Sequence, residues 1–159
     1  MKRNVVLLID ADADTSGATL EAARIAGLDV RCARTSRELF EMIQAGLDDV
    51  AVVVLDVDPG VHGMAVLEAL DAWALAPPVI VISSLEESYL RPVSLARGAK
   101  ECLGKAIGME RLTMAIKKFS RPSEARSCRC DAWGHPCKDC RERSSATSDR
   151  ELAFFAEEY

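Results

Sequence analysis

The stretch VAVVVLDVDPGVHG, Val50 to Gly63, decides the fold that the rest of this chain is expected to adopt. Its first six residues are apolar without any polar alternation, and four of them are β-branched. Such a run is typical of a central parallel strand that is buried on both faces. Asp56 ends the run, and ligands bind in open α/β sheets at the carboxyl ends of the strands. Asp56 is therefore a candidate site residue, although capping of a loop or of the next helix explains its position equally well.

Apolar runs and helical periodicities alternate on both sides of this strand. The other apolar runs predict strands over 4–9, 28–33, 79–82 and 101–103. Apolar residues at helical spacing predict helices over 19–26, from a capping box at 35–38 to Gly46, over 64–73, 85–97 and 109–119. In the first helix these apolar positions are Leu20, Ala23 and Ile25. Pro92 lies inside the fourth helix, which is therefore expected to be short, kinked or late-starting.

Strands that alternate with helices predict a parallel sheet with right-handed crossovers and helices on both faces. Five such units in about 120 residues make a doubly wound α/β domain, for which a flavodoxin-like five-stranded sheet is the usual solution. The predicted strand order is 2-1-3-4-5 and the domain covers residues 1–120. A small Cys-rich basic appendage follows over 121–147, and an amphipathic helix is predicted over 148–159.

The composition excludes several classes of protein. A net charge of −5 does not suit a binder of polyanions, and a hydrophobic content of 49% is too high for a disordered chain. Acidic residues from Asp10 onward stop the first apolar run far short of the ~20 residues that a membrane span requires. No signal peptide is visible either, so a cytoplasmic protein without membrane contact is expected.

Four polar residues end or follow predicted strands: Asp10, Asp56, Ser83 and Lys105. The ends of these four strands are expected to open onto the same crevice. Two carboxylates that face each other suit Mg²⁺, which commonly takes one or two carboxylates together with phosphate oxygens of a substrate. A carboxylate beside this ion could attack a phosphoryl group, while Lys105 neutralises one phosphate oxygen and Ser83 donates to another. Each residue alone has a structural explanation, but the set predicts phosphoryl transfer.

Four stretches that carry these residues also occur in this order in a known family: LLIDAD, VVVLDVDPGVHG, PPVIVISS and GAKECLGKAI. On these residues, the chain resembles a response-regulator receiver domain of the CheY-like family. The resemblance implies two-component or phosphorelay signalling, with Asp56 as phosphoacceptor and a histidine kinase or phosphotransfer protein as donor. It further implies Mg²⁺ ligation by Asp10, by Asp56 and by the backbone carbonyl of Asp58. Ser83 resembles the hydroxyl that senses the phosphoryl group, and Lys105 resembles the pocket lysine.

Several positions depart from the family pattern. Ala11 stands where a second acid is usual, which lowers the expected affinity for Mg²⁺ unless Asp12 supplies the missing ligand. Ala106 follows the pocket lysine in place of the usual cis-proline, and Cys102 replaces an aromatic switch residue. The loop between Asp56 and its glycine is one residue shorter than usual. The chain is therefore predicted to be an atypical receiver, either weakly phosphorylated or a pseudo-receiver that acts through protein contacts alone.

The segment 121–147 has four cysteines within thirteen positions: Cys128, Cys130, Cys137 and Cys140. Four thiolates suit tetrahedral Zn²⁺, and in a reducing compartment this pattern favours metal ligation over disulfides. His135, between the two pairs, is a substitute ligand. A structural zinc nodule is the prediction, and a redox-active thiol cluster or an unliganded tail are the alternatives.

The tail also bears on the choice of partner. Between Lys117 and Ser145 eight basic residues stand against four acidic ones, a balance of 8 − 4 = +4. A solvated linker around the metal nodule is favoured over a nucleic-acid contact, since the sequence has no helix-turn-helix and no basic patch interleaved with aromatic residues. A capping box at 148–151 opens the terminal helix, which is marginal alone. This helix is expected to dock on the receiver, on a second copy in a homodimer, or on a downstream protein partner.

Three functions therefore compete on the sequence alone. The first is a phosphoacceptor receiver with output through protein contacts, and the second is a phosphorylation-independent interaction module. The third adds a zinc-dependent contact between the tail and nucleic acid. An enzyme is not expected, because no nucleophile–base pair or dinucleotide fingerprint is present and His62 is a lone loop histidine.

Metal analysis of the purified protein tests the zinc nodule. We expect about one equivalent of zinc per chain, since four thiolates fill a tetrahedral coordination sphere. Replacing both Cys137 and Cys140 by serine should remove the metal, whereas replacing Cys32 and Cys102 should not. A wild-type protein that carries no zinc after purification under reducing conditions would contradict this prediction.

Overall fold

Five strands alternate with five helices in the part of the chain that the structure, a computed structural model, describes: residues 3–11, 16–58, 63–73, 76–106 and 108–120. The strands are β1 (Val5–Ile9), β2 (Asp29–Ala33), β3 (Val50–Asp56), β4 (Val79–Ser83) and β5 (Glu101–Gly104). The helices are α1 (Ser16–Ile25), α2 (Ser36–Ala45), α3 (Gly63–Ala72), α4 (Glu87–Ala96) and α5 (Met109–Ser120).

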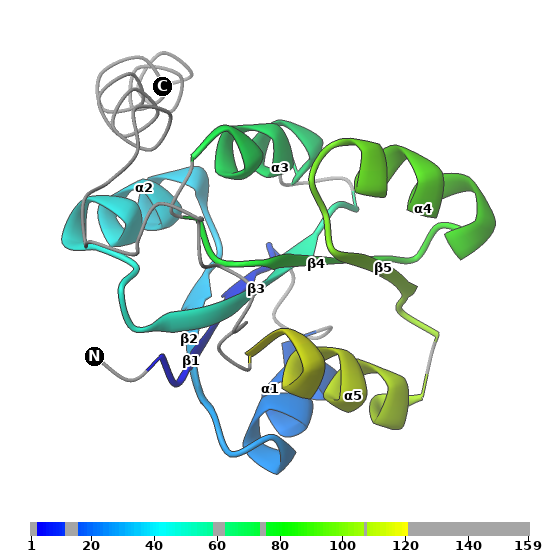
Figure 1. Ribbon diagram of the computed structural model, residues 1–159, viewed down its shortest axis with the longest axis horizontal. Coiled ribbons are helices and arrows are strands. Elements are labelled where there is room, and N and C mark those ends of the chain that lie inside the picture. Colours follow the sequence, from blue (N-terminus) through cyan, green and yellow to red (C-terminus); the bar gives the residue numbers. More distant parts are fainter. Residues whose placement is uncertain (1–2, 12–15, 59–62, 74–75, 107, 121–159) are drawn as a thin grey trace, which may run out of the picture.

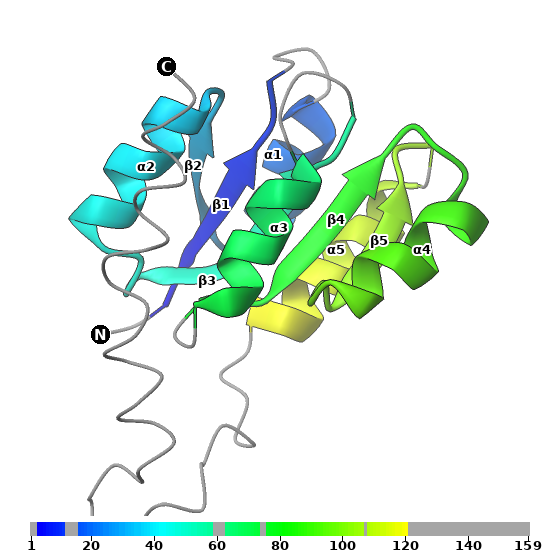
Figure 2. The same cartoon turned by 90° about the horizontal axis from the view of Figure 1, so that it is seen from above.

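All five strands pair in parallel, in the order β2-β1-β3-β4-β5. Helices α2, α3 and α4 cover one face of the sheet, and α1 and α5 cover the other (Figure 1). In Figure 2 the strands run side by side in this order, and their carboxyl ends lie at one edge of the sheet. The predicted doubly wound α/β fold with its flavodoxin-like strand order is confirmed.

The core consists of two layers, one on each face of the sheet. Every residue of β3 is buried, as its unbroken apolar run predicts, and from Val52 to Leu55 successive side chains enter opposite layers. The layer under α2, α3 and α4 contains Leu7, Ile9, Val53, Leu55 and Val81. The layer over α1 and α5 contains Leu8, Val52, Val54, Ile80 and Ile82. Because each such side chain contributes about 1.5–3 kcal/mol on burial, these central strands fix the frame of the sheet.

Helix α1 buries a different face from the one that its apolar residues indicate. Leu20 and Ile25 are exposed, and of the three predicted positions only Ala23 is buried. The buried face is made of small residues: Ser16, Thr19, Ala22 and Ala23. Because α1 packs closely against α5, small side chains fit this contact and large ones turn outward.

Helix α4 begins at Glu87, two residues after the predicted start, and keeps Pro92 inside it. This agrees with the late start that the proline predicts. Helix α2 forms its predicted cap: the Thr35 side chain accepts a hydrogen bond from the Glu38 N–H at 3.1 Å. The Glu38 carboxylate accepts from the Arg34 N–H at 2.7 Å, one residue earlier than in the usual capping box.

Several predicted features lie outside the described residues. They are Asp12, His62, the Cys-rich segment 121–147 with Cys128, Cys130, Cys137 and Cys140, and the terminal helix over 148–159. Within the described residues, no helix combines the length and the apolar character that crossing a membrane requires.

Candidate functional site

The carboxyl ends of four strands carry the polar residues that the sequence singles out. Asp56 and Ser83 are the last residues of β3 and β4, whereas Asp10 and Lys105 directly follow β1 and β5. Backbone pairing continues past the strand ends, because the Lys105 N–H donates to the Ser83 carbonyl at 2.7 Å. Ser83 and Asp56 are buried, and Asp10 is only 3% exposed. The topology thus places these four residues at one edge of the sheet.

Lys105 is the cation at the centre of this edge. Its Nζ donates to Asp56 Oδ2 at 2.6 Å and lies 2.8 Å from Asp58 Oδ2. One ammonium group therefore bridges the carboxylate that ends β3 and the carboxylate two residues later. The Asp56 side chain is 7% exposed, so this pair lies in a setting where charges interact more strongly than in bulk water.

Asp58 uses its side chain as well as its backbone in this site. Its Oδ1 accepts from Ser83 Oγ at 2.5 Å and from the Ser84 N–H at 2.9 Å. Its Oδ2 accepts from the same N–H at 3.0 Å and from the Ser84 hydroxyl. The Asp58 N–H in turn donates to Asp56 Oδ1 at 3.0 Å. The carboxylate of Asp58 is thus held by the end of β4 and by Lys105, while its backbone N–H is bonded to the end of β3.

Sequence reasoning missed this role of Asp58 and the role of Ser84. From the sequence, only the Asp58 backbone carbonyl was expected at the site, and Ser84 was not singled out. The signal was present as a second acid two residues after Asp56 and a second hydroxyl next to Ser83. Nothing in the spacing, however, indicates that these side chains turn toward each other.

The site that we call the notch is formed by Asp10, Asp56, Asp58, Ser83, Ser84 and Lys105. Within it, the pKa values of Asp56 and Asp58 shift in opposite directions. Burial raises the pKa of Asp56, and the nearby charge of Asp10 raises it further, against the opposing effect of Lys105. Burial also acts to raise the pKa of Asp58, but hydrogen bonds from Lys105 and the two serines hold it well below its ordinary value. Burial opposes the charged form of Lys105, yet its bonds to the two carboxylates raise its pKa. Negative charge is therefore stabilised on Asp58 and disfavoured on Asp56.

The residues at this edge fit Mg²⁺ as a partial ligand set. Asp10 directly follows β1 and Asp56 ends the neighbouring β3; burial raises the pKa of Asp56, and the charge of Asp10 adds to this effect. Two carboxylates and the Asp58 carbonyl leave positions for water and phosphate oxygens, as Mg²⁺ prefers. Ala11 supplies no ligand, and no group of three or more Asp, Glu, His or Cys side chains suited to a metal occurs among the described residues.

Comparison with known families bears directly on this arrangement. The family model described as "Response regulator receiver domain" matches residues 6–117, which is most of the chain. The chain belongs to this family. The resemblance stated from the sequence motifs is therefore confirmed for the receiver.

Solved structures agree with the fold of the receiver. A response regulator from Thermotoga maritima matches with a TM-score of 0.65 and 21% identity, covering 75% of this chain and 98% of that one. The BeF3-activated N-terminal receiver domain of RstA from Klebsiella pneumoniae matches with a TM-score of 0.65 and 20% identity, covering 75% of this chain and all of that one (100%). At these identities the likeness establishes the fold alone.

A curated relative shares more sequence over a shorter stretch. It is protein-glutamate methylesterase/protein-glutamine glutaminase 5 of Myxococcus xanthus (strain DK1622), with 41% identity over 86 residues. The match covers 52% of this chain but only 24% of that relative. Because this chain matches only about a quarter of that protein, the methylesterase and glutaminase activities in its name are not assigned to this chain.

Gly63 explains how the receiver brings α3 against the end of β3. A Cβ atom at this position would lie 2.7 Å from the Val57 Cα and 2.8 Å from the Asp56 carbonyl oxygen. Such distances are too short for any side chain, so glycine is required where the helix begins. The first residue of α3 thus lies tight against the end of the strand that carries the site.

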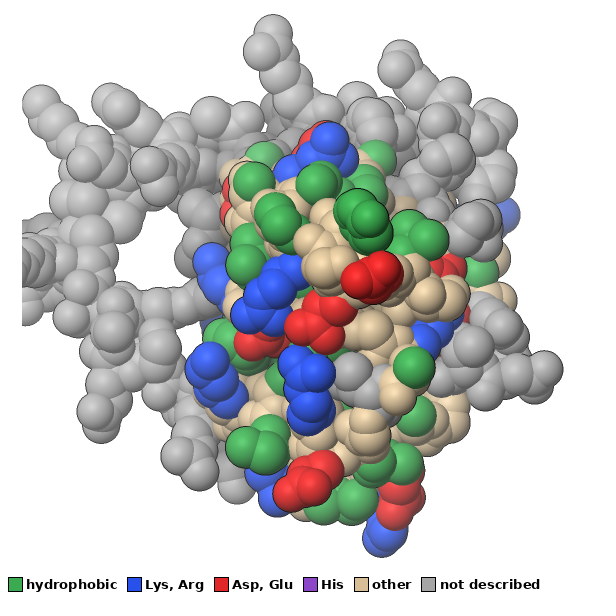
Figure 3. Space-filling view, turned by 90° about the vertical axis from the view of Figure 1, so that its right-hand side faces the viewer, with side chains coloured by type: hydrophobic (Ala, Val, Ile, Leu, Met, Phe, Trp, Pro, Cys, Tyr) green, Lys and Arg blue, Asp and Glu red, His purple; other side chains and the backbone are tan. Residues whose placement is uncertain are grey.

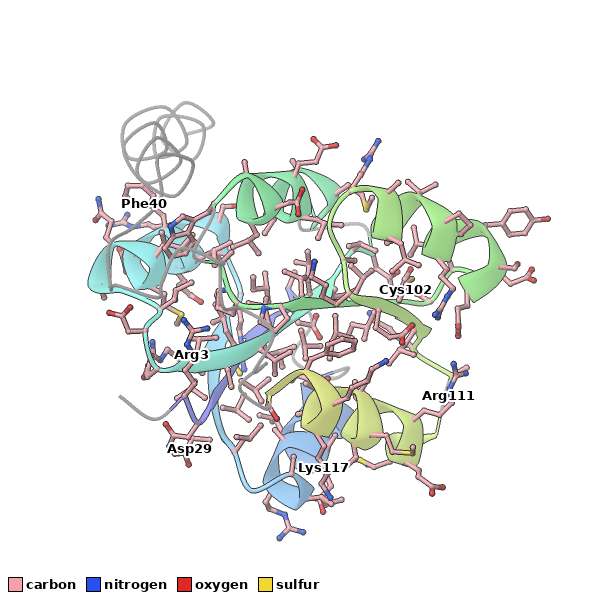
Figure 4. All side chains as sticks on the ribbon, viewed as in Figure 1. Arg3, Asp29, Phe40, Cys102, Arg111 and Lys117 are labelled. Carbon is pink, nitrogen blue, oxygen red and sulfur yellow. The ribbon has the colours of Figure 1, made fainter. Side chains whose placement is uncertain are left out.

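The departures at β5 change the face beside α4 and α5. Cys102 is 1% exposed and lies on the α4 side of β5, where Figure 4 labels it. The described residues contain no cis peptide bond, so the bond between Lys105 and Ala106 is trans. Cys32, the other cysteine on a strand, is half-buried. The buried Cys102 supplies no aromatic ring for this face.

Charged side chains gather across this same face, between more apolar regions (Figure 3). Arg91 pairs with Glu87 at 3.3 Å and with Glu101 at 2.5 Å, and it also donates to the Cys102 carbonyl at 3.3 Å. Arg111 of α5 reaches the same Glu87 at 3.3 Å. These pairs tie α4 to β5 and α5, so a movement of α4 would have to rearrange them.

Replacing Lys105 by methionine tests whether the lysine holds the notch together. The carboxylates of Asp56 and Asp58 would lose their shared cation, and we expect the free energy of unfolding in metal-free buffer to fall by about 2 kcal/mol. This is less than the 3–5 kcal/mol typical of fully buried pairs, because Lys105 is 19% exposed. Urea unfolding followed by circular dichroism measures the change.

Arg97→Met is the matched control, because Arg97 pairs with Glu68 on the surface at 3.3 Å. Exposed pairs of this kind contribute about 0.5 kcal/mol. Equal losses in the two variants would show that the site lysine has no special structural role.

Proposed function

We propose that this receiver is a phosphoacceptor in a two-component or phosphorelay system, with Asp56 as the residue that takes the phosphoryl group. The contact that supports this most is the 2.6 Å bond between Lys105 Nζ and Asp56 Oδ2 at the buried end of β3. It places a fixed cation beside a carboxylate whose negative charge burial disfavours. Such a carboxylate gains from forming a bond to an electrophile.

The donor in this proposal is the phosphohistidine of a histidine kinase or of a phosphotransfer protein. An Asp56 oxygen attacks the phosphorus atom, an acyl phosphate bond forms, and the bond between phosphorus and the imidazole nitrogen breaks. The imidazole leaves and takes up a proton. Lys105 neutralises charge on the transferred group as a point cation, and Ser83 donates a hydrogen bond to one of its oxygens.

Mg²⁺ bound by Asp10, Asp56 and the Asp58 carbonyl would supply further positive charge at the phosphoryl oxygens. Asp10, buried beside Asp56, adds negative charge that a divalent cation would neutralise together with Lys105. With alanine at position 11, the protein is expected to need more Mg²⁺ than receivers with two acids at this place.

Output in this proposal passes through protein contacts. Two large apolar side chains are exposed here: Leu85, just before helix α4, is 61% exposed, and Tyr89 within α4 is 77% exposed. Glu87, which lies between them in sequence, pairs with Arg91 and Arg111. A downstream protein partner could use this face together with the Cys-rich tail predicted from the sequence.

A second candidate is a pseudo-receiver that works without phosphorylation. It is favoured by one observation: the hydroxyl of Ser83 and the ammonium of Lys105 already hold an anion, the carboxylate of Asp58. In such a protein these bonds would only hold the ends of β3, β4 and β5 together, and binding to the partner would not depend on Asp56.

Incubation with acetyl phosphate and millimolar Mg²⁺ distinguishes the two candidates. We expect the intact mass to rise by one phosphoryl group, and we expect Asp56→Asn to abolish this gain, because the amide cannot form the acyl phosphate. Asp48→Asn, on the exposed turn before β3, is the matched control and should be labelled like the wild-type protein. No labelling of the wild-type protein would favour the pseudo-receiver.

A further inference from the structure

The carboxylate of Asp58 accepts from three residues: Ser83 and Ser84 at the end of β4, and Lys105 after β5. Ser83 Oγ at 2.5 Å and the Ser84 N–H at 2.9 Å bond to one oxygen. Lys105 Nζ at 2.8 Å, the Ser84 N–H at 3.0 Å and the Ser84 hydroxyl contact the other. One or two of these bonds would be enough to fix the conformation of a loop. The Asp58 carboxylate instead contacts an ammonium group, two hydroxyls and a backbone amide.

This donor set is the one that the proposed phosphorylation of Asp56 requires. A phosphoryl group on Asp56 would be neutralised by Lys105 and would accept from Ser83 and from the neighbouring backbone. Lys105 already spans Asp56 Oδ2 and Asp58 Oδ2, so the Asp58 carboxylate occupies the side of the lysine next to the acceptor. Carboxylate and phosphoryl oxygens compete for the same charge-assisted hydrogen bonds.

We propose that the Asp58 side chain is a resident anion in the phosphoryl subsite of Asp56, and that phosphorylation requires its displacement. This inference rests on the proposed function. It gives Asp58 a role in setting how readily Asp56 reacts, separate from any metal contact through its backbone carbonyl. Asp58 thereby acts as a positioning residue that holds Ser83 and Lys105 in place before any phosphoryl group arrives.

The surroundings of Asp58 allow this exchange. Its side chain is 14% exposed, twice the 7% of Asp56, so it lies nearer the mouth of the notch. Displacement by a phosphoryl group would replace one anion by another on the same donors. Ser83 would therefore donate to an anion both before and after phosphorylation. Its hydroxyl would move less than a hydroxyl that binds no anion before phosphorylation.

The test compares Asp58→Asn and Asp58→Ala with the wild-type protein. The asparagine keeps the shape of the side chain without its charge, and the alanine removes the competing group. The readouts are the initial rate of labelling by acetyl phosphate in Mg²⁺ and the beryllofluoride concentration that half-saturates the site, followed by fluorine NMR. Circular dichroism and thermal unfolding show that each variant is folded.

We expect both substitutions to raise the labelling rate and to lower the half-saturating beryllofluoride concentration by about tenfold, since hydrogen bonds to charged groups are among the stronger ones. Asp49→Asn is the matched control. It removes the same charge just before β3, at the opposite end of the strand, where Asp49 pairs with Arg31. This control should behave like the wild-type protein, which excludes a general effect of net charge.

The outcomes distinguish this inference from the proposed function. Faster labelling of both Asp58 variants supports the inference, and so does labelling of the variants when the wild-type protein takes no label at all. Labelling of the wild-type protein at the same rate as folded Asp58→Asn and Asp58→Ala would overturn the inference and leave the proposed function intact. No labelling and no beryllofluoride binding by any of the proteins would overturn both.

Discussion

The structure depends on one ammonium group placed among carboxylates at the carboxyl edge of a parallel sheet. Lys105 contacts Asp56 and Asp58, and the charge of Asp10 acts on the same site. Two unit charges 4 Å apart interact by about 4 kcal/mol at the effective dielectric constant near a protein surface. Without a cation the carboxylates would repel each other, so Lys105 makes their proximity tolerable. The proposed phosphoryl transfer to Asp56 requires the same proximity, so in that proposal the lysine links stability to function.

The sheet topology places this cation. In a doubly wound sheet with β1 and β3 side by side, the ends of four strands that are distant in sequence open at one edge. Backbone pairing of Lys105 with Ser83 fixes the lysine next to β4. Gly63 keeps the following helix close to Asp56. The chemistry of the notch therefore follows from register and close packing.

Much of this could be predicted from sequence, and the exceptions have physical reasons. The apolar run of β3 predicts burial on both faces, and strand ends predict where Asp10, Asp56, Ser83 and Lys105 lie. The direction of the Asp58 side chain could not be predicted, because it depends on bonds to residues 25 and 26 positions away. The buried face of α1 was predicted wrongly, since close contact with α5 selects small residues over Leu20 and Ile25.

The departures from the family pattern concern two regions. At the notch, Ala11 leaves the metal ligand set short, while Asp58 adds an anion to the donors. At the α4–β5–α5 face, Cys102 is buried and Arg91 ties α4 to β5. In the proposed function, such a receiver would hold its donors in place before phosphorylation, and the Asp58 carboxylate would restrain the reactivity of Asp56.

A crystal structure of the protein with Mg²⁺ and beryllofluoride tests this account most directly. We expect the beryllofluoride group to be bonded to an Asp56 oxygen and its fluorine atoms to contact Ser83 and Lys105. We also expect the Asp58 carboxylate to contact neither Ser83 nor Lys105 in that structure. A structure in which Asp58 still holds Ser83 and Lys105, with no beryllofluoride on Asp56, would contradict this account.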